Sequence, residues 1–138
     1  MPGHLIRRLH QNSAQIFALR MREAGLDATP VQFAALCEIR AHPGIDQAGV
    51  AAAIAYDRAT IGGVIDRLEQ KQWIARAIST RDRRARVLTL TETGAAMLAR
   101  MHPVVVRLQA EILPGLTEAE RDTFLALARK ATAAEGES

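Results

Sequence analysis

Arginine side chains are concentrated in one short stretch of the chain, residues 76–86, which reads RAISTRDRRAR. Five arginines occur there with a single acid, Asp82, and five positive charges less one negative give +4, more than the +3 of the whole 138-residue chain. Guanidinium groups bind backbone phosphates and favour the negative potential of a narrow minor groove. The stretch therefore predicts contact with DNA, and the alternative is an ordinary solvated turn.

Two short predicted helices precede the arginine-rich stretch. Asp46 is expected to cap a helix over residues 47–55, and Asp57 a second helix over residues 58–71, because a carboxylate accepts hydrogen bonds from the first free amides of a helix. Only Tyr56 separates the two helices. So tight a joint is typical of a helix-turn-helix, in which the second helix lies in the major groove of DNA.

The early part of this second helix is predicted to face the bases. Arg58 and Thr60 can donate hydrogen bonds to base edges or phosphates. Gly62 and Gly63 each cost about 1 kcal/mol relative to alanine in a helix, and we interpret them as a place where the helix backbone lies close to DNA. The predicted contacts from this helix are Arg58, Ala59, Thr60, Gly62, Gly63 and Arg67. For Arg67, a structural salt bridge is the alternative.

A β-hairpin is predicted after the second helix. Residues 74–79 and 86–91 are rich in β-prone side chains, and the second segment alternates apolar and polar residues. The connecting residues 80–85 are too highly charged to enter a hydrophobic core. The arginines of the hairpin that are predicted to contact DNA are Arg81, Arg83, Arg84 and Arg86.

Helices are also predicted near both ends of the chain. Apolar residues recur at helical spacing over residues 4–24, and Gly25 follows as a C-terminal cap. Thr29-Pro30 is a strong start for a helix that ends near Arg40. Two further helices are expected after the hairpin, the first to about Leu113 and the second to about Ala133. The predicted order is α-α-α-α-β-β-α-α, a mainly α fold with a small β component.

Composition and motifs exclude several classes of function. Apolar residues make up 49% of the chain and aromatic residues 4%, which favours a helical globular protein. The chain has one cysteine, Cys37, and four dispersed histidines, so we expect neither a disulfide nor a metal site. No nucleophile elbow, zinc-binding helix or phosphate loop is present, so we expect no enzyme activity and no cofactor. With no long apolar run, the expected location is the bacterial cytoplasm, on the nucleoid when bound to DNA.

Three runs of sequence carry a resemblance to a known family. TPVQFAALCEI at residues 29–39, YDRATIGGVIDRLEQKQW at 56–73 and DRRARVLTLTETG at 82–94 resemble the multiple antibiotic resistance regulator (MarR) family, and the likeness extends over essentially the whole chain. The resemblance implies one MarR-like domain over residues 1–138 that works as a homodimer on double-stranded DNA with a pseudo-palindromic operator. It further implies a winged helix-turn-helix over about 29–91 and dimerisation helices at about 4–24 and 93–134.

The resemblance also implies roles for individual residues. Arg84 matches the wing-tip arginine that enters the minor groove, and Asp82 matches the acid that stabilises its turn. Asp57 matches an acid that pairs with the wing arginine. The chain departs from the family pattern at two places: Ser79 replaces a frequent aspartate, and Gly62-Gly63 replaces a frequent Thr-Arg pair. The departures leave the operator sequence open.

Repression gated by a ligand is a further implication of the resemblance. Small aromatic or heteroaromatic acids are frequent effectors in the family, bound between the dimerisation helices and the DNA-binding lobe. Polar residues predicted near that junction are His10, Asn12 and Arg40, since arginine can pair with a carboxylate and histidine can bind a ring substituent. An ordinary surface role is the alternative for each. Cys37 lies on an apolar helical stripe, and we expect its thiol to be inert.

Two other functions compete with a ligand-released repressor. The first is a DNA-binding regulator without a small-molecule effector, controlled by its abundance or by a protein partner. The second is a helix-turn-helix protein that mediates only protein contacts. The arginines of residues 81–86 weigh against the second, because they have no role in a core.

Overall fold

The structure is a computed structural model that describes the backbone of residues 1–136 and the side chains of residues 1–133. Its elements, in chain order, are α1 (Pro2–Glu23), α2 (Pro30–Ala41), β1 (Ile45–Asp46), α3 (Gln47–Ala53), α4 (Arg58–Gln70), β2 (Ile74–Ile78), β3 (Arg86–Leu90), α5 (Glu92–Ile112) and α6 (Glu118–Gly136). The mainly α class is confirmed, and the predicted order gains one strand, β1.

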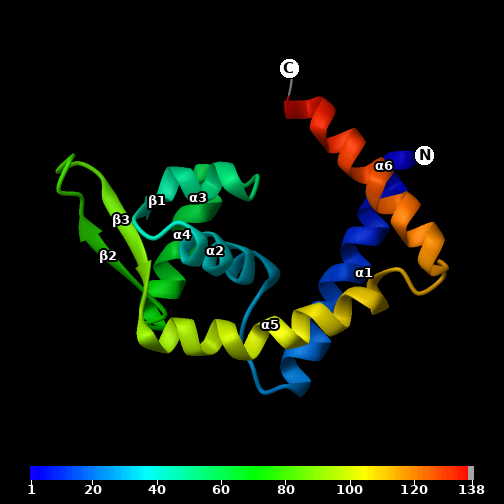
Figure 1. The fold of residues 1–138 in the computed structure, drawn as a ribbon, viewed down its shortest axis with the longest axis horizontal. Helices are drawn as coiled ribbons and strands as arrows, with labels where there is room; N and C mark the ends of the chain where they lie inside the picture. Colours follow the sequence, from blue (N-terminus) through cyan, green and yellow to red (C-terminus); the bar gives the residue numbers. More distant parts are fainter. Residues whose placement is uncertain (137–138) are drawn as a thin grey trace.

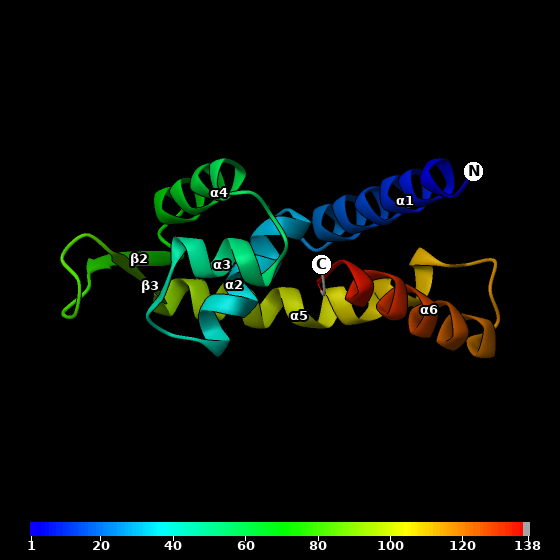
Figure 2. The same ribbon diagram turned by 90° about the horizontal axis from the view of Figure 1, so that it is seen from above.

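The elements form two lobes joined by α5 (Figure 1). We call the first the reading lobe; it contains α2, α3, α4 and the sheet. The second, the terminal lobe, contains α1, α6 and the second half of α5. Figure 2 shows α1 and α6 on either side of the end of α5, with the reading lobe at the opposite end of the molecule. The α5 helix runs through Pro103 without interruption and links the two lobes.

Local signals set the boundary between α1 and α2. Gly25 has a φ of +71°, and the amide of Leu26 donates to the carbonyl of Met21 at 2.9 Å, which is the Schellman ending that a C-terminal glycine favours. At the start of α2, Thr29 Oγ1 accepts from the amide of Gln32 while Gln32 Oε1 accepts from the amide of Thr29, both at 3.2 Å. Both predicted boundaries are confirmed.

The sheet has three antiparallel strands in the order β1-β3-β2. In the two ladders, Ile45 pairs with Leu88 and Ile74 pairs with Leu90. The amide of Gly44 donates to the carbonyl of Leu88 at 2.9 Å and brings β1 onto the edge of β3. Sequence reasoning missed β1 because a strand of two residues shows no alternation of apolar and polar side chains.

The joint between α3 and α4 is longer than predicted. The α3 helix ends at Ala53 instead of extending to Ala55, so Tyr56 is not the only connecting residue. Ala55 adopts a φ of +59°, and the amide of Tyr56 donates to the carbonyl of Ala51 at 3.0 Å. A left-handed alanine costs about 1–2 kcal/mol. Because helices usually end in this conformation at a glycine, the alanine gave no signal in the sequence for the end of α3.

The start of α5 is fixed against the corner between α4 and β2. Thr91 Oγ1 donates to the carbonyl of Gln72 at 2.6 Å, and the amide of Thr91 donates to the carbonyl of Trp73 at 3.0 Å. Gly94 lies directly under this corner, since a Cβ at Gly94 would lie 1.9 Å from the carbonyl oxygen of Trp73. The first turn of α5 therefore packs directly against the corner between α4 and β2.

Candidate nucleic-acid interface

The α4 helix presents one apolar face to the core and one polar face to solvent. Ile61, Ile65 and Leu68 are fully buried. The residues predicted to face DNA are exposed, apart from half-buried Gly62; they are Arg58, Ala59, Thr60, Gly62, Gly63 and Arg67. The structure therefore leaves these residues free to meet a ligand, as a recognition helix requires.

Asp57 caps α4 through both of its carboxylate oxygens. Oδ1 accepts from the amide of Thr60 at 2.7 Å, and Oδ2 accepts from the Thr60 hydroxyl at 2.9 Å. These hydrogen bonds lower the pKa of Asp57, with the Thr60 amide as the main cause. The resemblance implied that Asp57 pairs with Arg84, but among the ion pairs of the described residues there is none between them. Asp57 acts as the N-cap of α4 instead.

The glycines of α4 have open surroundings within the chain. A Cβ at Gly63 would meet nothing within 4 Å, and one at Gly62 would meet only the end of the Gln47 side chain at 3.3 Å. No other segment of the described chain therefore requires a small residue at Gly63. The open space beside Gly63 leaves room for a bound molecule to approach the backbone of α4.

Side-chain hydrogen bonds shape the tip of the wing between β2 and β3. Ser79 Oγ accepts from the amides of Arg81 and Asp82 at 3.2 and 3.3 Å. Asp82 Oδ1 accepts from the amide of Arg84 at 3.0 Å, and the carbonyl of Asp82 accepts from the amide of Ala85 at the same distance. Ser79 therefore performs with a hydroxyl the local bonding for which a carboxylate is also suited.

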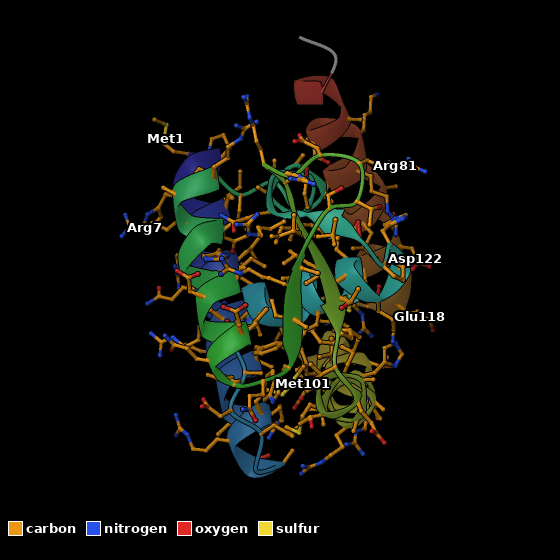
Figure 3. All side chains as sticks on the ribbon, turned by 90° about the vertical axis from the view of Figure 1, so that its left-hand side faces the viewer. Met1, Arg7, Arg81, Met101, Glu118 and Asp122 are labelled. Carbon is orange, nitrogen blue, oxygen red and sulfur yellow. The ribbon has the colours of Figure 1, made fainter. Side chains whose placement is uncertain are left out.

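The arginines of the wing differ in how free they are. Arg81, Arg83, Arg84 and Arg86 are all exposed. Figure 3 views the molecule from the side on which the hairpin projects, with Arg81 at the loop between its two strands. Arg76, counted in the arginine-rich stretch above, is instead half-buried and forms ion pairs with Asp66 and Glu69 of α4. It joins β2 to α4 through these ion pairs.

Comparison with known proteins agrees with this geometry. Residues 28–85 match the MarR family. The chain is 35% identical over 128 residues to the HTH-type transcriptional repressor NicR of Pseudomonas putida, a match that covers 93% of this chain and 80% of NicR. The chain belongs to the MarR family. MarR-family proteins are transcriptional regulators, so the expectation of a regulator in place of an enzyme is confirmed.

Solved structures of MarR-family proteins show the same fold. The structure of Bordetella bronchiseptica BpsR, described with the regulation of its DNA binding by 6-hydroxynicotinic acid, matches with a TM-score of 0.88 and 33% identity, over 96% of this chain and 93% of that one. The transcriptional repressor CouR bound to a 23-mer DNA duplex matches with a TM-score of 0.86 and 27% identity, over 96% and 92%. The winged-helix fold of this MarR-family chain is thus confirmed.

The three residues predicted to bind an effector lie apart from one another within a single chain of this protein. His10 lines a groove of about 740 Å³ between α1, α5 and α6. Asn12 lines a different groove, of about 500 Å³, where α5 meets the loop before α6. Arg40 is exposed in the last turn of α2, in the reading lobe. A single chain does not assemble the three into one pocket.

Lys71 is a residue that sequence reasoning missed. Its ammonium contacts the linker between α1 and α2, the first turn of α2 and the ring of Trp73. The linker and α2 partners, Asp27 and Gln32, lie about forty residues away in the sequence, and no periodicity or motif connects such distant positions. Only the fold could reveal the cluster.

Other expected absences concern metals, membranes and thiol chemistry. Among the described residues, no three His, Cys, Asp or Glu side chains are placed to hold a metal ion. No helix within the described part of the chain has the length and apolar character needed to span a bilayer. Cys37 is half-buried, and burial raises the pKa of its thiol, which favours the protonated and unreactive form.

Proposed function

We propose that this MarR-family protein is a homodimeric repressor that binds a pseudo-palindromic operator and releases it when a small aromatic or heteroaromatic acid binds. One observation carries the DNA-binding part. The exposed face of α4 and the four exposed arginines of the wing belong to one rigid unit, because Arg76 of β2 is ion-paired with Asp66 and Glu69 of α4. Such a unit can engage a major groove and an adjacent minor groove together. Its site of action would be the bacterial nucleoid.

The dimer is supported by apolar surface in the terminal lobe. Leu5 and Ile6 of α1 are 57% and 64% exposed, and Leu125 and Leu127 of α6 are 44% and 60% exposed. Side chains from both helices line the groove that contains His10. A contiguous apolar surface of this kind favours association. We assign dimerisation to helices 4–24 and 93–134 and DNA reading to residues 29–91, within a single domain.

The two-fold axis of a dimer gives the proposal its geometry. Two copies of α4 can enter successive major grooves only when they lie about 34 Å apart, one turn of DNA. An effector that binds better to a dimer with another separation lowers DNA affinity by its differential affinity for the two states. We place the effector site at the junction of the lobes, where a second protomer can complete what one chain leaves separated.

The wing is tested by Arg84→Ala. We expect operator affinity to fall several-fold or more. The slope of log affinity against log salt should flatten by about 1, because the variant loses one cation that contacts a phosphate or the minor groove. Binding is measured by fluorescence anisotropy at two salt concentrations. Arg129→Ala in α6 is the matched control, an exposed arginine in the terminal lobe. An unchanged affinity and slope for Arg84→Ala would refute the assignment of the wing.

The effector is tested separately. A thermal-shift screen of small aromatic and heteroaromatic acids, with 6-hydroxynicotinic acid included because of the likeness to BpsR, should reveal a compound that raises the melting temperature. The same compound should release the operator at concentrations that saturate the protein. If DNA is bound and no acid releases it, the second candidate stands: a DNA-binding regulator controlled by its abundance or by a protein partner.

A further inference from the structure

The Lys71 ammonium, at the C-terminal end of α4, contacts groups from two distant segments of the chain and the ring of the neighbouring Trp73. Nζ donates to the backbone carbonyl of Asp27 at 2.6 Å and to Gln32 Oε1 at 3.2 Å. The Asp27 carboxylate lies 3.7 Å away, and the centre of a Trp73 ring lies 4.4 Å away. Only 19% of the Lys71 side chain is exposed. An ammonium with this many partners is held in one place, unlike a lysine on an open surface.

The partners of Lys71 are also tied to one another. Gln32 Oε1, which accepts from Lys71, also accepts from the amide of Thr29 and so closes the capping box of α2. Asp27 belongs to the linker that leaves α1 after Gly25. A shift of this linker relative to α4 would therefore break hydrogen bonds at Lys71 and disturb the start of α2.

The reading lobe is joined to the terminal lobe by two segments of chain, and each is fastened near α4. On the α5 side, Thr91 and Gly94 contact the corner at Gln72 and Trp73. On the α1 side, the fastening is the Lys71 ammonium. A favourable interaction with the helix dipole would explain a cation at the end of α4, but it would not explain the contacts to the linker.

We propose that Lys71 is a positioning residue that holds the recognition helix at a set orientation relative to α1, and so sets the half-site spacing that the dimer accepts. This inference rests on the proposed function, because it requires a dimer that binds two half-sites. The physical reason is rigidity: without the ammonium, α4 and the linker are no longer joined by hydrogen bonds. The two reading lobes can then fit operators of several spacings at a lower affinity for the best one.

The test uses Lys71→Met, which retains an unbranched apolar stem beside Trp73 and removes the charge and the donors. The probes are a duplex selected by the wild-type protein from a random-sequence DNA library, the same duplex with one base pair inserted or deleted between the half-sites, and an unrelated duplex. We expect about a tenfold loss of affinity for the selected duplex and a similar loss of discrimination against altered spacing, with binding to unrelated DNA changed by less than about twofold.

Gln70→Met is the matched control. It introduces the same side chain at an exposed position of α4 next to Lys71, outside the predicted DNA contacts and the dimerisation helices, and should leave affinity and spacing preference as in the wild type. Should Lys71→Met fail to fold, Lys71→Gln is measured in its place, because an amide can retain one of the hydrogen bonds. The circular dichroism spectrum and melting temperature of each variant are recorded alongside.

Three results would overturn the inference. A lower melting temperature with unchanged spacing discrimination would make Lys71 a contributor to stability alone. If the slope of log affinity against log salt flattens by about 1 while spacing discrimination is retained, Lys71 is a phosphate contact. If the wild-type protein selects no sequence from the library, the proposed function itself fails. If the wild type selects a sequence and Lys71→Met binds it with the same affinity and spacing discrimination, the positioning role of Lys71 is refuted and the proposed function stands.

Discussion

The reading lobe and the terminal lobe differ in how far one chain completes them. In the reading lobe, Ile61, Ile65 and Leu88 have no exposed surface. In the terminal lobe, Leu125 and Leu127 of α6 keep 44% and 60% of their surface exposed, although they line the same groove as His10. The core of the reading lobe is thus closed within one chain, with Phe17 and Met21 of α1 packed into it, whereas α6 leaves its leucines in water.

Because of this difference, the shape of the DNA-reading surface and the distance between two such surfaces depend on different contacts. The shape of the DNA-reading surface depends on contacts within one chain, such as the ion pairs of Arg76. The distance between two reading surfaces depends on contacts that one chain cannot make. The α5 helix belongs to both lobes, because Leu98 and Met101 are buried in the core while Val106 is 58% exposed. Changes in the reading lobe should therefore act on stability and DNA contacts, and changes in the terminal lobe on association.

Gly94→Ala is expected to have the largest effect. The added Cβ would lie 1.9 Å from a backbone carbonyl oxygen, which cannot move aside as a flexible side chain can. We expect the free energy of unfolding to fall by about 3 kcal/mol or more, measured by urea denaturation. Gly3→Ala is the control, because its Cβ would meet nothing within 4 Å. Equal denaturation midpoints for the two variants would show that the start of α5 is not fixed.

Leu125→Asp combined with Leu127→Asp should affect only the terminal lobe. If each leucine contributes about 1.5–3 kcal/mol on burial by a partner, the dissociation constant of the dimer rises at least a hundredfold or so. Sedimentation velocity measures the change, and circular dichroism should still show a folded protein. Ala126→Asp, which places a charge outside the residues lining the groove, should associate more tightly than the double variant. A double variant that dimerises as the wild type does would place the interface elsewhere.

Gly63→Ala should separate stability from DNA binding within the reading lobe. Because the new methyl group meets nothing inside the chain, we expect the free energy of unfolding to rise by about 0.5–1 kcal/mol. If the backbone of α4 lies close to the bases, operator affinity should fall at the same time. Urea denaturation and anisotropy on the same preparation provide both quantities. A more stable protein with unchanged operator affinity would show that Gly63 leaves no room that DNA uses.

Ala55→Gly is expected to have the smallest effect. Glycine removes the strain of a φ of +59°, but it also adds freedom to the unfolded chain, so a net gain of about 0.5 kcal/mol remains. Operator affinity should be unaltered, because the backbone of the joint already has this conformation. A loss of stability in urea would mean that the alanine methyl group packs favourably and outweighs the strain.

Much of the reading lobe could be predicted from short-range signals. Thr29 and Gln32 form the predicted start of α2, and Asp57 caps α4 as expected, since capping depends on residues three positions apart. The hairpin could be predicted from the alternation of apolar and polar residues in its second strand and from the charged residues at its tip. The two-residue strand β1 and the left-handed Ala55 were missed, because neither carries a pattern that a local reading detects.

The candidate site was predicted in its parts but not in its connections. The concentration of arginines in residues 76–86 could be seen in the sequence. It did not show that Arg76 forms a structural ion pair with Asp66. Asp57 forms the predicted helix cap, while the pairing with Arg84 that the resemblance implied is not among the ion pairs of the described residues. Likewise, the effector candidates His10, Asn12 and Arg40 could be chosen by chemistry, while their separation between two lobes is a matter of the fold.

Short-range signals in the sequence were enough to predict the helices and the two strands of the hairpin, the place where positive charge is concentrated and the family that the chain resembles. Each of these depends on residues close together in the chain, where hydrogen bonding and periodicity act over a few positions. Tertiary structure alone decided that Lys71 meets Asp27 and Gln32, that Gly94 lies against Trp73, and that α6 leaves its leucines exposed. Those contacts join residues tens of positions apart, and only packing brings such residues together.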